Sequence, residues 1–233
     1  MKKNLLSATM FFVILLLTSV KAIPLSPEIP KGNFTGIELR NAANVYVTQG
    51  EATDIKIEAD EEVASKLILE IKNDVLVIRS EKENNSYGKK KIDIYVTVKT
   101  LKLLELAGSG NMIMKNQVKG DDMSLLLSGS GNIEGSIDVK DLKMSIAGSG
   151  NIDVKGKTND STVKISGSGD VNGKELKTST STVSISGSGT STVDVGDELN
   201  VTITGSGNVY YLSAPEKIHS KIVGSGKIEK VKA

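Results

Sequence analysis

The chain has 233 residues, no cysteine or tryptophan, 23 glycines and a formal net charge of +1. The even charge balance gives no basic surface of the kind that binds nucleic acid, and the lack of cysteine excludes disulfide bonds. With three phenylalanines, the core has to be aliphatic and thin, which suits a solenoid better than a globular domain.

The first 22 residues are typical of a secretory signal peptide. Residues 1–3 include two lysines, residues 5–17 form an apolar run, and small residues lead up to Ala22. We predict cleavage after Ala22, because the apolar run is shorter than the roughly 20 residues that span a bilayer. The mature chain then has a net charge of −2 and no membrane span. We expect it to be exported, to the periplasm or the cell surface.

Residues 23–32 contain three prolines and predict an extended linker. In residues 33–105, alternating segments predict strands at 34–39, 44–48, 54–58, 67–71, 75–79 and 92–98. Asp60 is expected to cap one helical turn with Val63 facing inward, and residues 81–91 form a charged loop. We expect residues 33–105 to make irregular coils of the same single domain, 33–231.

Seven Gly-Ser-Gly triplets recur from there to the C-terminus, at intervals of 18 to 21 residues. They begin at Gly108, Gly129, Gly148, Gly167, Gly187, Gly205 and Gly224. Such regular spacing predicts one structural unit repeated in space, here over residues 106–231. The glycines are expected at coil corners, where positive φ or close backbone packing leaves no room for a Cβ.

Aligned on the first glycine, the repeats show alternating columns of apolar and polar residues. Two places before the glycine lie Leu106, Leu127, Ile146, Ile165, Ile185, Ile203 and Ile222. Four places before it lie Leu104, Leu125, Met144, Val163, Val183, Val201 and Ser220. The column between them is mostly polar, so a two-residue pleat points the apolar columns inward. After the triplet a second apolar column follows, which Ser191 interrupts.

Two further features of the repeats carry structural predictions. Asn111, Asn132, Asn151 and Asn208, with Asp170 in register, are expected to bond turn amides or one another along the stack. Pro215 and the lysine-rich tail after Val231 predict a cap at the C-terminal end. Stacked coils bury aliphatic columns that one coil cannot bury alone.

The chain resembles the exported bacterial proteins described as putative auto-transporter adhesin, head GIN domain. The resemblance lies in residues 34–37, 44–50, 57–60 and 74–78 and in the Gly-Ser-Gly-Asn-Ile repeats. It implies an all-β fold, a right-handed parallel β-helix with about 19–20 residues between corners. It also implies adhesion as the activity, and it supplies no catalytic motif.

Candidate chemical sites in the sequence are weak. A phosphate loop would need a following helix, and strands follow the glycines here. The calcium-binding column of a glycine-rich repeat is not kept, which leaves at most one isolated site near Asp153 and Asp170. His219 is the single histidine and is predicted to be a surface residue. The acidic group at 58–62 is interpreted as a solvated turn, and the Ser/Thr-rich stretches 178–184 and 190–192 as exposed strand.

The sequence therefore predicts a non-enzymatic, exported cell-envelope β-solenoid without catalytic, cofactor or metal residues. Its expected partner is a glycan, a matrix component or an envelope protein, and a homo-oligomer is possible. Two alternatives stay open. One is an envelope scaffold or sensor that assembles through strand edges, and the other is a β-helix carbohydrate-active enzyme, which would need a cleft with convergent carboxylates.

Overall fold

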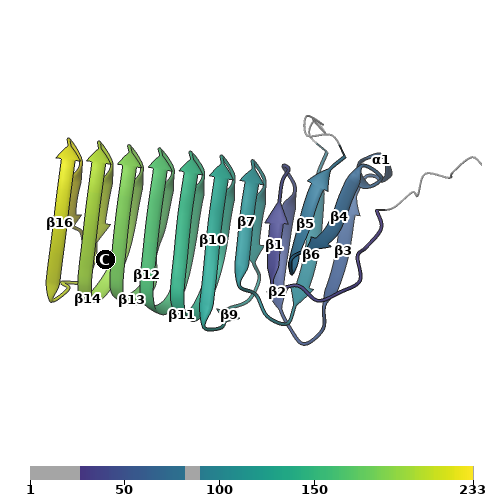
Figure 1. Cartoon of the computed structure of the whole chain (residues 1–233), viewed down its shortest axis with the longest axis horizontal. Coiled ribbons are helices and arrows are strands. Elements are labelled where there is room, and N and C mark those ends of the chain that lie inside the picture. The colour runs from purple at the N-terminus through teal and green to yellow at the C-terminus, as the bar shows by residue number, and fades with distance from the viewer. Residues whose placement is uncertain (1–26, 82–89, 233) are drawn as a thin grey trace, which may run out of the picture.

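The computed structural model describes residues 27–81 and 90–232, which form a β-solenoid (Figure 1). Within these residues α1 (Glu61–Ala64) is the single helix and all other elements are strands. The predicted leader, residues 23–26 of the linker and most of the predicted charged loop lie outside the described residues. In the described part, no helix is long and apolar enough to cross a membrane.

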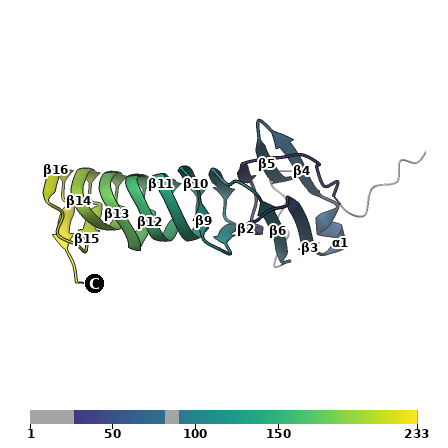
Figure 2. The ribbon, with the colours of Figure 1, turned by 90° about the horizontal axis from the view of Figure 1, so that it is seen from below.

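Each repeat coil contributes to two walls of one continuous 17-stranded sheet. The long strands run along one wall, bend, run along the other wall and end at a Gly-Ser-Gly corner. These strands are β11 (Asn132–Gly148), β12 (Asn151–Gly167), β13 (Asp170–Gly187) and β14 (Thr190–Gly205). Figure 2 shows the coils stacked one behind another along the long axis of the molecule.

The first wall contains the strand segments that lead into the triplets. In spatial order it consists of β4 (Leu67–Lys72), β5 (Val75–Ser80), β1 (Gly36–Leu39), β7 (Leu103–Gly108), β10 (Asp122–Gly129), the second halves of β11 to β14, and β16 (Lys217–Gly224). All neighbours pair in parallel except β4 and β5, which are antiparallel.

The second wall contains the segments that follow the triplets. It consists of β3 (Asp54–Ala59), β6 (Ile92–Val98), β2 (Asn44–Gln49), β8 (Asn111–Met114) with β9 (Val118–Lys119), the first halves of β11 to β14, β15 (Asn208–Tyr211) and β17 (Lys227–Lys230). Here the pairing of β3 with β6 is antiparallel.

The predicted inward columns form the core between the two walls. Val163 and Ile165 are typical, because they align with Met144 and Ile146 on one side and with the valine and isoleucine of β13 on the other. Both are at most 2% exposed. Each such side chain contributes about 1.5–3 kcal/mol on burial, which offsets the cost of ordering the backbone only when coils stack.

The predicted corner glycines are confirmed, and the two glycines of a triplet serve different purposes. The first glycine has a φ between +121° and +136° in six triplets, a region that residues with a side chain rarely adopt. The third glycine has no positive φ. At Gly150, for example, a Cβ would lie 2.3 Å from the carbonyl oxygen of Gly131 in the preceding coil. Close coil contact therefore excludes a side chain there.

The two ends of the solenoid differ from the expectations in part. Val63 in α1 is buried and Asp60 is the N-cap, as predicted, although the Asp60 side chain makes no capping hydrogen bond. The predicted C-terminal cap is wrong for the described residues. β16 and β17 continue the stack in register and β16 is exposed along its whole length, because Pro215 lies in the short link between β15 and β16.

Candidate functional site

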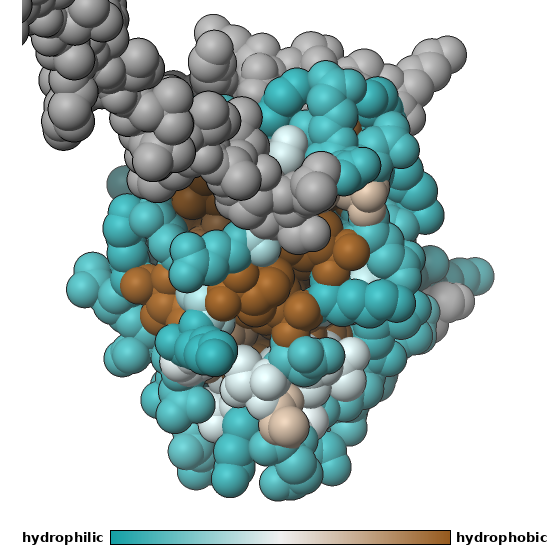
Figure 3. Space-filling view, turned by 90° about the vertical axis from the view of Figure 1, so that its right-hand side faces the viewer, coloured by the Kyte–Doolittle hydropathy of each residue, from teal (hydrophilic) through white to brown (hydrophobic). Residues whose placement is uncertain are grey.

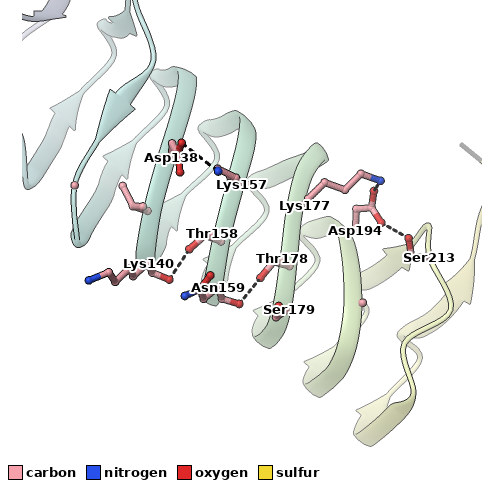
Figure 4. Close-up of a pocket in the computed structure, with 13 residues that line it drawn as sticks. Asp138, Lys140, Lys157, Thr158, Asn159, Lys177, Thr178, Ser179, Asp194 and Ser213 are labelled. Carbon is pink, nitrogen blue, oxygen red and sulfur yellow. Dashed lines mark hydrogen bonds and ion pairs between the residues drawn. The ribbon is translucent and has the colours of Figure 1, made fainter.

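A groove of about 510 Å³ crosses the coils at the corner opposite the Gly-Ser-Gly triplets (Figure 4). The bend between the second and the first wall, near residues 138–141 of β11 and the aligned positions of the next coils, forms this groove. Its lining residues are Gly120, Asp138, Val139, Lys140, Lys157, Thr158, Asn159, Lys177, Thr178, Ser179, Asp194, Gly196 and Ser213.

Two buried threonines fix the floor of the groove. The hydroxyl of Thr158 donates to the carbonyl oxygen of Lys140 in the preceding coil at 2.9 Å, and that of Thr178 lies 3.1 Å from the carbonyl oxygen of Asn159. At a bend these carbonyl oxygens point away from the strand ladder, so a neighbouring hydroxyl satisfies them. These two hydrogen bonds hold the bends of neighbouring coils together.

Charged side chains form a column along one side of the groove. Asp138, Lys157, Lys177 and Asp194 occupy the same position in four successive coils. The Lys157 ammonium lies 3.4 Å from the Asp138 carboxylate, and Lys177 pairs with Asp194. In Figure 4 the two lysines point in opposite directions, each toward its aspartate. The column therefore presents two ion pairs, with the lysine ammonium groups largely exposed to solvent.

Asp194 is the buried member of this column, with its side chain 4% exposed. Burial opposes its charged form, but hydrogen bonds from Lys177 and Ser213 outweigh this and lower the pKa of the carboxyl group below its ordinary value of 3.8. A buried carboxylate is stable when it is paired and hydrogen-bonded in this way. Asp194 thus anchors the end of the groove in its ionised form.

The other side of the groove is polar and solvent-exposed. Lys140, Asn159 and Ser179 follow the bend in successive coils, and all three are exposed. Neighbouring coils lie about 4.8 Å apart. An extended molecule lying along the groove would therefore meet amide, hydroxyl, ammonium and carboxylate groups at a regular interval. Such groups donate and accept hydrogen bonds to hydroxyl-rich ligands.

Asp153 and Asp170, the residues considered for an isolated calcium site, form hydrogen bonds to neighbouring coils. The Asp153 carboxylate accepts a hydrogen bond from Asn172 at 2.7 Å, and that of Asp170 accepts one from the Thr190 backbone at 2.8 Å. Within residues 27–81 and 90–232, the structure brings no three His, Cys, Asp or Glu side chains close enough to hold a metal ion. The two carboxylates link neighbouring coils instead.

The acidic group at 58–62 is an ion-paired surface turn. Glu62 pairs with Lys66 at 2.8 Å and with Lys90 at 3.0 Å, and these hydrogen bonds lower the pKa of Glu62 to about 2. Glu58 pairs with Lys56 at 2.6 Å. His219 is exposed on β16, as expected. These residues belong to the surface and do not converge on the groove.

The interpretation of the Ser/Thr-rich stretches as exposed strand is wrong for three of their nine serine and threonine side chains. Thr178, Ser181 and Ser191 are buried, because each occupies an inward position of the two-residue alternation. Ser181 accepts a hydrogen bond from Ser161 at 2.8 Å inside the core. Thr178 is one of the two threonines of the groove floor, and regular spacing of Lys157-Thr158 and Lys177-Thr178 was the signal that sequence reasoning missed.

The predicted asparagine column is confirmed for Asn111, Asn132 and Asn151 and extends to Asn44, which was not predicted, whereas the Asn208 side chain makes no hydrogen bond in the described structure. Each side-chain amide donates to the side-chain oxygen of its neighbour at 2.8 to 3.0 Å, from Asn151 through Asn132, Asn111 and Asn44 to Asp93. Burial opposes the charged form of Asp93, but hydrogen bonds from Asn44 and Lys91 lower the pKa of its carboxyl group. The column is a structural ladder that holds the coils in register.

A stacked pair of tyrosines lies on the outer face of the second wall. The ring centroids of Tyr46 and Tyr95 are 5.0 Å apart, the Lys56 ammonium lies over the Tyr95 ring at 5.8 Å, and the Lys115 ammonium lies over the Tyr46 ring at 5.6 Å. Each ring therefore interacts with the other ring and with an ammonium group. Tyr95 is nevertheless 37% exposed, and the pair lies apart from the groove.

The family model described as putative auto-transporter adhesin, head GIN domain, matches residues 33–215. The chain belongs to this family. Every residue that lines the groove falls inside the matched range. Comparison with curated proteins gives no match.

Several solved structures share the fold of this head GIN domain. A putative adhesin from Bacteroides fragilis has a TM-score of 0.82 at 21% identity, covering 86% of this chain and 93% of its own. A putative adhesin from Parabacteroides merdae has a TM-score of 0.70 at 24% identity, covering 88% and 94%. A putative lipid binding protein from Parabacteroides distasonis has a TM-score of 0.70 at 28% identity, covering 88% and 95%.

Proposed function

We propose that this head GIN domain is an exported, non-enzymatic binding module of the cell envelope that holds a glycan chain along the groove. The observation that carries the proposal is the column of ion-paired and exposed polar side chains that repeats from coil to coil along it. The adhesin names of the family and of its structural relatives agree with a surface-binding role.

The chemistry of the groove favours a hydroxyl-rich ligand over an acidic or an apolar one. Lys157 and Lys177 have aspartate partners, so the column contributes no net charge. Ion-paired ammonium and carboxylate groups still have unused donors and lone pairs for ligand hydroxyls. Asn159 and Ser179 add neutral donors and acceptors opposite them. A linear glycan lying along the groove would meet a polar side chain in each coil, although the type of side chain changes from coil to coil.

The spacing of the carboxylates argues against glycoside hydrolysis. Asp138 and Asp194 are three coils apart, which corresponds to about 14 Å at a strand spacing of about 4.8 Å. Glycosidases place their two carboxyl groups roughly 5 to 9.5 Å apart, one of them protonated. Both aspartates are also ion-paired, and Asp194 has a lowered pKa. The pair suits binding better than acid–base catalysis.

A lipid is the rival ligand, because one structural relative is named a putative lipid binding protein. Its acyl chain would need an apolar pocket, and the polar groove does not provide one. The candidate site for an acyl chain is a separate pocket of about 510 Å³ at the N-terminal end, lined mainly by Pro27, Ile29, Ile55, Ile57, Ala59 and Ala64. Binding of a fluorescent fatty acid there, in place of any glycan, would favour the rival.

A glycan array tests the proposal. The purified exported chain is applied to printed host and bacterial glycans, and affinities for the oligosaccharides that bind are measured by calorimetry. We expect the triple variant Lys157→Ala, Asn159→Ala, Ser179→Ala to weaken binding at least tenfold. The matched control Lys164→Ala, Ser184→Ala, Thr202→Ala removes similar exposed groups from the first wall and leaves affinity unchanged. Equal affinities for the two variants, or no glycan bound, would overturn the proposal.

A further inference from the structure

Both ends of the solenoid leave strand edges without a partner in the described part of the chain. At the C-terminal end, β16 pairs only with β14 and β17 only with β15. At the N-terminal end, β3 pairs only with β6 and β4 only with β5. Figure 1 shows β16 at one end of the stack and β3 and β4 at the other. Each free edge presents backbone N–H and C=O groups that can pair with another strand.

The apolar core is also partly exposed at both ends. At the N-terminal end the linker residues Pro27 and Ile29 and helix α1 lie beside β3, so the linker has to move aside when a second copy pairs there. On β16, Ile218 and Ile222 continue the inward columns of Leu199 and Ile203 but are 41% and 40% exposed. Figure 3 looks onto the N-terminal end and shows an apolar patch with hydrophilic residues on either side. The partly buried residues of that end are Ile55, Ile57, Ala59 and Ile71. Each end would bury this surface against a suitable partner.

The charges of the two ends are opposite. Residues 51–66, which include β3 and α1, carry six acidic side chains and two lysines, and Lys90 pairs with Asp60 and Glu62 there, which leaves a net charge of −3. Residues 215–232, which include β16 and β17, carry five lysines and two glutamates, a net charge of +3. Two C-terminal ends would repel each other, and an N-terminal end would attract a C-terminal one.

The strand register extends this match to single residues on the second wall. Rows of aligned residues run straight along the wall, so Asp93 and Lys227 lie in one row, and Tyr95 and Glu229 in the next. Within one copy, β3 pairs with β6 so that Glu58 lies opposite Asp93, in the first of these rows, and Lys56 lies opposite Tyr95, in the second. If β3 of a second copy takes the same rows on β17, Glu58 faces Lys227 and Lys56 faces Glu229.

The first wall gives the same result independently. On β5, the strand β4 places Glu70 opposite Val77 and Ile68 opposite Arg79. The Val77 row reaches Lys221 on β16, and continuing the same register by two residues brings Arg79 into line with Val223. A second copy in the same register therefore sets Glu70 against Lys221. It also covers Val223, which is 57% exposed, with Ile68. Charge and apolar surface match on both walls.

We infer that two copies of this chain associate head to tail, with β3 and β4 of one copy adding to β17 and β16 of the next. The contact is heterologous, so it repeats and forms open rows of solenoids. In the alternative tail-to-tail arrangement, the β16 strands of two copies would pair in antiparallel fashion, with Ser220 opposite Ser220. Lys221 of each copy would then lie opposite His219 of the other, between two basic strands. Since exposed charge pairs carry part of the contact, the association weakens as salt increases.

Charge reversal with rescue tests the inference by analytical ultracentrifugation of the purified exported chain at low salt. The wild type is expected to gain mass with concentration beyond a dimer and to lose it in 0.5 M salt, at which charges are screened within several ångströms. Lys227→Glu alone and Glu58→Lys alone should each stay monomeric. Their equimolar mixture should regain the wild-type masses, because each junction then joins opposite charges.

Lys164→Glu, on the side of the first wall, is the matched control and should assemble as the wild type does. Circular dichroism spectra that match the wild type show that the reversed variants remain folded. A wild type that stays monomeric at every concentration, a closed dimer, or a mixture no heavier than its components would overturn the inference. So would a monomer whose N-terminal end binds a fatty acid instead.

Discussion

Gly150 gives the sharpest test of how the coils are held together. It is the third glycine of its triplet, and a Cβ at this position would lie 2.3 Å from the Gly131 carbonyl oxygen and 2.5 Å from the Leu127 Cδ2 atom. Real Cβ contacts are essentially never shorter than 3.0 Å. The carbonyl oxygen is backbone and accepts the Asn151 N–H at 3.1 Å. Gly150→Ala must therefore move two coils apart locally.

The cost follows from these contacts. Weakening the Asn151 to Gly131 hydrogen bond costs about 0.5–1.5 kcal/mol. Overpacking against Leu127 adds about 1–3 kcal/mol. We therefore expect Gly150→Ala to lower the free energy of unfolding by about 2–4 kcal/mol, and Gly150→Val by more.

Urea unfolding at 25 °C, followed by circular dichroism, measures this loss as a lower midpoint at unchanged slope. Gly120→Ala is the control, because a Cβ at Gly120 would have no atom within 4 Å. That variant should match the wild type or gain up to about 1 kcal/mol from a less flexible unfolded chain. Equal midpoints for the two alanine variants would refute the role of close coil contact.

Three further changes probe the core and the groove. The Ser191 hydroxyl is buried with no hydrogen-bond partner in the described structure, so Ser191→Val should raise the free energy of unfolding in urea by about 1–2 kcal/mol; a lower urea midpoint would contradict this. Ile165→Asp should lose about 3–5 kcal/mol, and a near-neutral result would show that its column faces outward. The lowered pKa of Asp194 means that its stabilisation is complete above the unfolded value of 3.8 and is lost as the pH falls through the folded pKa. Asp194→Asn should therefore lose less stability on acidification below pH 3.8 than the wild type does, and parallel pH curves would argue against this role.

The repeat half of the fold could be predicted because each coil reuses the same local rule. Alternating side chains fix which columns face inward, and the 18 to 21-residue interval fixes which residues align. Ile165 and Gly150 were placed correctly for that reason. The N-terminal half was harder. The segments at β3 and β4 alternate in the same way whether they pair in parallel or antiparallel, so the pattern could not predict their antiparallel pairing.

The groove escaped prediction because the repeated Lys-Thr pairs at 157–158 and 177–178 do not by themselves show which face of the strand each side chain occupies. Threonine is common in exposed strands, so the sequence around Thr158 and Thr178 does not distinguish them. Only the folded bend shows that their hydroxyls form hydrogen bonds with carbonyl oxygens of the preceding coil. Asp194 reads as one more surface acid until Lys177 and Ser213 are brought to it by stacking. Polar residues within a solenoid thus need the register before they can be assigned to a face.

The most direct test of the glycan-binding groove is an NMR titration of the isotope-labelled chain with an oligosaccharide that binds on the array. We predict that backbone amide signals shift along the groove, at Lys140, Asn159 and Ser179 in successive coils, while those of the first-wall residue Lys164 stay in place. Shifts confined to Ile55, Ile57 and their neighbours at the N-terminal end, with the groove signals unchanged, would contradict it.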